Sequence, residues 1–107
     1  MKSYTDLSQS KKLAEILPIE TADMRYVPFG DTHPWVWNEK VKLLEKDSVP
    51  CWSLAALIEV LPNENMLVKT TDGEHYCLAK DVMTKHYDNP VDACYEVIVK
   101  LKKKNLL

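Results

Sequence analysis

The chain has 107 residues, of which 46% are hydrophobic and 28% charged, and its formal net charge is −2. This length and composition predict one globular domain over residues 1–107 with a single core. The small net charge excludes a general attraction to nucleic acid or anionic membrane, and the presence of only two glycines argues against a glycine-rich nucleotide loop.

The three cysteines, Cys51, Cys77 and Cys94, are widely spaced and form no CxxC pair. Their odd number and spacing argue against a disulfide framework and against a cysteine-rich zinc site. No window approaches the ~20 apolar residues of a membrane span. The first residues also lack the apolar stretch of a signal peptide. We therefore expect no membrane partner and a cytoplasmic location.

The first predicted helix begins at a capping box, with Asp6 as the N-cap and Gln9 at the third helical position. Pro18 cannot continue the helix and ends it. Residues 24–29 have the composition of a strand, which Pro28 restricts to a sheet edge. Residues 35–46 fit a strand and a helix about equally, and we expect a strand over residues 35–41.

The longest apolar run, residues 49–62, predicts a short central helix. Ser53 is its expected N-cap, and Trp52 and Leu57 occupy the two positions of a hydrophobic staple. Ile58 continues the apolar stripe, and Pro62 ends the helix. We expect this helix to form the buried centre of the fold.

Residues 66–71 and 74–79 both have strand composition and flank Asp72-Gly73. An Asp-Gly pair between two strands predicts a β-hairpin with a type I′ turn. Residues 82–87 alternate and predict a third strand. A last helix is expected to start with Asn89 as N-cap and Pro90 at its first position. The predicted fold is therefore α+β, with about three helices packed on one face of a small antiparallel sheet.

Three blocks of sequence carry a family resemblance: Thr-Ala-Asp-Met at 21–24, Pro-x-Trp-Ser-Leu at 50–54 and Pro-x-Asp-Ala at 90–93. Together with the Ser-Gln-Ser-Lys-Lys-Leu segment at 8–13, they resemble an uncharacterised family of small proteins from phages, prophages and mobile elements of gut Bacteroidetes. The basic segment at residues 100–104 departs from the close of that family. The resemblance implies a fold and a setting, and it carries over no catalytic residue.

The residues that suggest chemistry are few and scattered. Asp31 and His33 could ligate a metal together with His75, Cys77 or His86, but no paired ligand motif supports such a site. Cys51 precedes the central helix, where the helix dipole would lower the pKa of a nucleophilic thiol, yet the sequence indicates no partner base. We therefore predict no enzyme, no metal and no cofactor.

Two surfaces remain as candidates for binding. The aromatic residues Tyr26, Phe29, Trp35 and Trp37 predict a patch that binds a protein partner or forms a homodimer. The preferred hypothesis is therefore a non-enzymatic interaction module of a mobile element. The alternative is a nucleic-acid-associated accessory protein whose phosphate contacts are Lys100, Lys102, Lys103 and Lys104.

Overall fold

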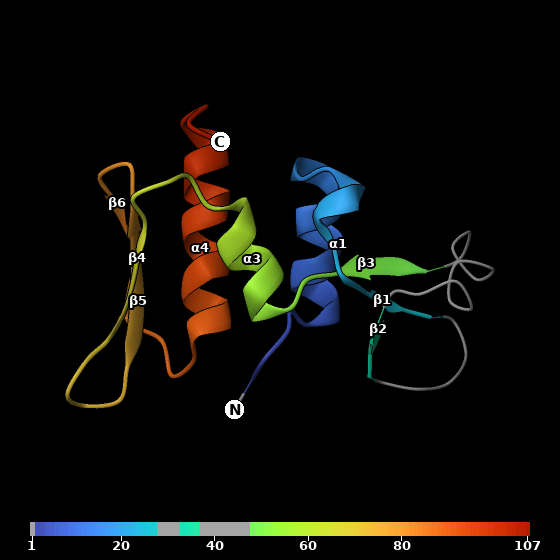
Figure 1. Cartoon of the computed structure of the whole chain (residues 1–107), viewed down its shortest axis with the longest axis horizontal. Coiled ribbons are helices and arrows are strands. Elements are labelled where there is room, and N and C mark those ends of the chain that lie inside the picture. The colour runs from blue at the N-terminus through green and yellow to red at the C-terminus, as the bar shows by residue number, and fades with distance from the viewer. Residues whose placement is uncertain (1, 28–32, 37–47) are drawn as a thin grey trace.

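The computed structural model describes residues 2–27, 33–36 and 48–107 (Figure 1). Within them lie three α-helices, one 3₁₀ turn and six strands. In chain order these are α1 (Leu7–Ile16), η1 (Ile19–Thr21), β1 (Met24–Tyr26), β2 (Trp35–Val36), β3 (Val49–Cys51), α3 (Leu54–Val60), β4 (Met66–Lys69), β5 (His75–Ala79), β6 (Val82–Met83) and α4 (Pro90–Lys103). The predicted α+β class is confirmed.

The strands form two antiparallel sheets rather than one, in the orders β2-β1-β3 and β4-β5-β6. Figure 1 shows the two sheets at opposite ends of the molecule, with the helices between them. Helix α4 packs on β5, α3 packs on α4, and α1 packs on β3. Each sheet therefore has its own helix, and α3 lies between the two halves.

The core is built around α3 and α4. Trp52 and Leu57 are fully buried, as are Val91, Cys94 and Ile98 on α4. The predicted Ser53 cap is confirmed, because its hydroxyl accepts a hydrogen bond from the Ala56 N–H. A helix of only seven residues that packs mainly on one neighbour leaves one side free. Ile58 lies on that side and keeps 39% of its surface exposed, so the apolar stripe is narrower than predicted.

The predicted hairpin is confirmed, but its turn has a different geometry. β4 and β5 pair in register up to Lys69 and His75, which leaves residues 70–74 as the connection. The Gly73 N–H donates to the Thr70 carbonyl, and of the Asp72-Gly73 pair only Gly73 has a positive φ, +80°. The connection is a turn closed by a glycine bulge. The predicted type I′ turn at Asp72-Gly73 is wrong.

Positive φ at two successive turn residues occurs instead between β5 and β6. Lys80 and Asp81 have φ values of +50° and +64°, and Ala79 pairs with Val82 on either side of them. This is the two-residue hairpin geometry that suits the strand twist. It is built here without glycine, so both residues adopt a backbone conformation that L-residues disfavour.

The third strand of this sheet is confirmed in a shorter form. β6 ends at Met83, and pairing with β5 resumes at an isolated bridge between His75 and Tyr87. Between these points the Thr84 hydroxyl accepts a hydrogen bond from the Cys77 N–H at 2.9 Å. Thr84 is buried, so its side chain replaces a ladder bond inside the core.

The first two blocks of the family resemblance meet in space. The Trp52 indole N–H donates to the Thr21 hydroxyl at 2.9 Å. The Asp23 carboxylate accepts hydrogen bonds from both the backbone N–H and the hydroxyl of Ser53. The Thr-Ala-Asp-Met block therefore holds the start of α3 in place, which gives both blocks a structural role.

The third block is tied to the capping box of α1, which is itself confirmed. Asp92 lies in the first turn of α4, where its N–H donates to the Asn89 side chain. Its carboxylate accepts hydrogen bonds from Gln9 at 2.7 Å and from Lys2 at 2.8 Å. One carboxylate thus joins the starts of α1 and α4.

The segment before α1 runs beside the start of α3. The Thr5 N–H donates to the Trp52 carbonyl at 2.9 Å, and the Leu54 N–H donates to the Ser3 carbonyl at 3.0 Å. Thr5 is fully buried, and its hydroxyl also accepts from the Trp52 N–H. Residues 3–5 are therefore an integral part of the fold.

Candidate functional site

The four aromatic residues of the predicted patch do not form one exposed surface among the described residues. Tyr26 is half-buried, and its hydroxyl donates to the Thr5 carbonyl at 2.7 Å. Burial and the neighbouring Cys51 raise the pKa of Tyr26 above its ordinary value. This side chain therefore ties β1 to the segment that precedes α1. Phe29 and Trp37 lie outside the described residues.

Trp35 remains on the surface. It forms β2 together with Val36, and these two residues are 41% and 65% exposed. They pair with Arg25 and Met24 of β1, on the opposite side of β1 from β3. This apolar pair at residues 35 and 36, which we call the β2 surface, is what the described residues retain of the predicted patch. The rest of the predicted strand, residues 37–41, lies outside the described part of the chain.

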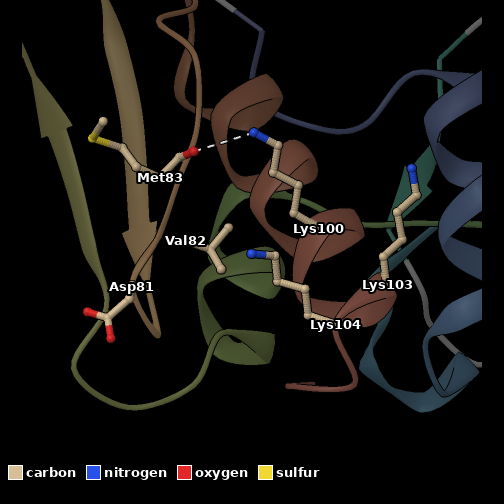
Figure 2. A pocket seen from close by; sticks show the side chains of 6 residues that line it. All are labelled: Asp81, Val82, Met83, Lys100, Lys103 and Lys104. Carbon is tan, nitrogen blue, oxygen red and sulfur yellow. Dashed lines mark hydrogen bonds between the residues drawn. The ribbon is translucent and has the colours of Figure 1, made fainter.

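Three of the four candidate lysines line one surface pocket of about 300 Å³ (Figure 2). Lys100, Lys103 and Lys104 come from the last turns of α4, and Asp81 and the β6 residues form the opposite wall. Figure 2 shows the Lys100 and Lys104 side chains directed toward β6, whereas Lys103 points away from them. The pocket is therefore cationic but does not focus three ammonium groups on one point.

Lys100 is already engaged. Its ammonium lies 3.4 Å from the Glu96 carboxylate and 3.4 Å from the Met83 carbonyl oxygen. Lys102 lies apart from this pocket, on the opposite boundary of α4 with α1 and α3. The structure therefore does not bring the four predicted phosphate contacts together as one set.

The cysteines have the buried character expected of small apolar residues, and all three are free thiols. Burial raises the pKa of the Cys51 thiol, which opposes the formation of a nucleophilic thiolate. Its sulfur lies 3.4 Å from the Thr5 carbonyl oxygen and so contacts the backbone. A hydrogen bond with Cys77 and burial likewise raise the pKa of Cys94. The geometry does not favour a reactive thiol at Cys51 or Cys94.

The candidate metal ligands do not converge. His75 and Cys77 share the buried face of β5, as predicted for residues two apart on a strand. His86 lies at the surface, where it stacks on Tyr76 with ring centroids 4.9 Å apart. Among residues 2–27, 33–36 and 48–107, no three histidine, cysteine or acidic side chains are placed to hold a metal ion. Asp31 lies outside these ranges.

A groove that the sequence does not predict lies between α1, η1, α3 and the end of α4. Two concavities of about 690 Å³ and 480 Å³ share Thr21, Glu59 and Val60 and therefore adjoin. The lining carries four carboxylates, and Lys102 is the one cation among its described lining residues. We call it the acidic groove and define it by Glu15, Ile16, Glu20, Asp23, Glu59 and Val60.

Sequence reasoning missed the acidic groove for a clear reason. Glu15, Glu20 and Glu59 lie on α1, η1 and α3, and each alone is typical of a solvated helix face. No spacing rule links residues from three elements. Only the packing of α3 beside η1 brings their carboxylates to one rim.

Comparison with known proteins gives no further guide, since no family model, no curated protein and no solved structure matches the chain. None of the described helices combines the length and the apolar character needed to cross a bilayer.

Proposed function

We propose that this protein is a non-enzymatic interaction module that binds a protein partner through the β2 surface. The observation that supports this most directly is the exposure of Trp35 and Val36 on one two-residue strand, at 41% and 65%. Tryptophan is enriched among the residues that dominate binding energy at protein interfaces. A tryptophan beside an exposed β-branched residue therefore suits a docking surface better than open water.

The polar residues of the fold give secondary support. Thr21, Asp23 and Asp92 are each engaged in hydrogen bonds that hold helix starts together. The buried thiol of Cys51 has its pKa raised by burial. Side chains of catalytic type are thus used for structure, which agrees with a binding role.

The test is photo-crosslinking from the β2 surface. A photoreactive amino acid placed at position 36 should crosslink one defined partner in the native host, and Trp35→Ala should abolish that product. The matched control places the same group at position 66, because Met66 is also an exposed apolar strand residue, at 55%. Equal crosslinking from both positions, or a product that survives Trp35→Ala, would count against the proposal.

A second candidate is a nucleic-acid-associated role, which the cationic pocket favours. Lys103 and Lys104 form no ion pair with another described residue and are available to phosphate oxygens. Asp81 in the same pocket and the engagement of Lys100 weigh against it. Retention on DNA should then fall in Lys103→Ala/Lys104→Ala, with a shallower salt dependence. Retention unchanged by this variant would remove the candidate.

The wider setting is also a proposal. Association with a phage or another mobile element rests on the three sequence blocks, and a cytoplasmic location is in keeping with three free cysteines. Expression of the gene together with that of an adjacent mobile element, measured in the native host, tests the first part.

A further inference from the structure

We propose that the acidic groove binds the lysine-rich end of α4 from a second copy of this chain, so that two copies associate reciprocally. This inference stands apart from the role of the β2 surface, because the groove and the β2 surface share no residue. It assigns a partner to a groove that combines an apolar floor with a rim of carboxylates.

The groove itself indicates the chemistry of its occupant. Ile16 and Val60 form an apolar floor, and both pack against the core while remaining partly accessible. Glu20 and Glu59 lie exposed on the rim, and neither forms an ion pair with a described residue. Apolar surface flanked by unpaired carboxylates suits a segment that carries both apolar side chains and cations.

The chain supplies such a segment at the end of α4. Lys102, Lys103 and Lys104 are exposed, and Leu106 and Leu107 follow with exposed fractions of 42% and 37%. The Leu106 N–H donates to the Leu101 carbonyl, and Asn105 has a φ of +57°. This bonded helix end fixes the leucines beside the lysines, so the segment meets a partner with little loss of conformational entropy.

The position of the segment favours a reciprocal arrangement. Lys102 and Leu107 already border the groove of their own copy. When the two-fold symmetry axis of the proposed dimer lies at this border, the α4 end of each copy reaches the groove of the other copy. Both copies then use the same surface, so the assembly stops at two chains. The net charge of −2 is small and opposes pairing only weakly. A nucleic acid is disfavoured in this groove because the carboxylates repel phosphate.

The decisive experiment is a charge exchange followed by light scattering. The wild-type chain should give a mass that rises with concentration toward that of two chains, and high salt should weaken the association. Glu20→Lys/Glu59→Lys and Lys103→Glu/Lys104→Glu should each weaken it by about tenfold or more. A one-to-one mixture of the two variants should restore the dimer, because the altered groove of one variant then meets the altered α4 end of the other, while the second contact joins a native groove to a native α4 end.

The matched control is Lys69→Glu/Lys85→Glu, which makes the same change in net charge as Lys103→Glu/Lys104→Glu at two exposed lysines outside the acidic groove and the end of α4. It should dimerise like the wild-type chain. A wild-type chain that stays monomeric at every concentration overturns the proposal. So does a mixture of variants, each folded by circular dichroism, that fails to restore the dimer.

One further variant separates this proposal from the function proposed above. Trp35→Ala should leave the dimer unchanged if the acidic groove is the contact. A dimer that Trp35→Ala abolishes and the charge reversals leave intact would overturn the groove as the contact and would support the β2 surface. Binding of a cationic peptide by a chain that remains monomeric would also overturn it.

Discussion

The two sheets of this protein differ in how far apart their strands lie in the sequence. β4, β5 and β6 follow one another within residues 66–83 and are joined by short turns. β2, β1 and β3 come from separate segments, and β1 pairs Met24 with Cys51. The β4-β5-β6 sheet, which we call the local sheet, is specified by the residues of its own short turns. The β2-β1-β3 sheet depends on hydrogen bonds between residues far apart in the sequence, such as those of Thr21 and Asp23 with Trp52 and Ser53.

The largest expected effect comes from removing the Trp52 side chain, which is buried in the core and donates a hydrogen bond to Thr21. Trp52→Ala should lower the free energy of unfolding by about 4 kcal/mol, because it empties a fully buried site and leaves Thr21 without its donor. Urea denaturation measures this. Trp52→Phe keeps most of the packing and should cost clearly less. Equal losses in the two variants would mean that the hydrogen bond, rather than the buried volume, dominates.

The next effect tests the local sheet alone. Thr84→Val keeps the shape of the side chain but leaves the buried Cys77 N–H without its acceptor. The free energy of unfolding should fall by about 2 kcal/mol. Hydrogen exchange should quicken in β5 and leave β1 and β3 protected. Thr71→Val, at an exposed turn position, is the control and should change little. Loss of protection in both sheets would show that they do not differ in this way.

A third prediction concerns the link between α1 and α4. Burial acts to raise the pKa of Asp92, but hydrogen bonds from Lys2, Asn89 and Gln9 outweigh it and the pKa lies below its ordinary value. The stabilisation is therefore present above the unfolded-state pKa of about 3.9 and is lost as the pH falls through the folded-state pKa.

Asp92→Ala should accordingly cost about 1.5 kcal/mol at neutral pH, since it removes hydrogen bonds to a charged group. The difference from the wild-type chain should stay constant down to about pH 5 and shrink below about pH 4. Chemical denaturation across this range measures it. Asp72→Ala, at an exposed carboxylate in the turn between β4 and β5, provides the control. A difference that grows in acid would contradict the assigned direction.

The smallest effect sharpens the contrast between the two turns of the local sheet. Lys80→Asn/Asp81→Gly should raise the free energy of unfolding by about 1 kcal/mol, because both residues have positive φ without glycine. Gly73→Ala should lower it by a similar amount, about 1 kcal/mol, although a Cβ there meets no atom within 4 Å. Thermal unfolding should therefore shift in opposite directions. Shifts of the same sign would show that φ does not control these turns.

What the sequence predicts correctly are features set within a few residues. The capping box at Asp6, the Ser53 cap and the Asn89-Pro90 start of α4 are each confirmed. The predicted type I′ turn at Asp72-Gly73 is wrong because a turn with a glycine bulge and a type I′ turn share the same sequence signal.

What the sequence does not predict depends on contacts between distant segments. The division into two sheets follows from β1 pairing with β3, and no local pattern reports that pairing. The exposure of Ile58 depends on which side of α3 meets α4. The acidic groove, likewise, exists only once α3 and η1 are packed together. Long-range packing, rather than residue type, decides each of these features.

The pairing of residues 3–5 with residues 52–54 affects how the chain folds while it is being synthesised. The Thr5 N–H finds its acceptor, the Trp52 carbonyl, only after that part of the chain has left the ribosome. Lys2 and Gln9 must wait longer still, until Asp92 has emerged. This segment is made before its partners and therefore completes its contacts late, and a pause in translation before residue 92 would leave it exposed to proteases and chaperones.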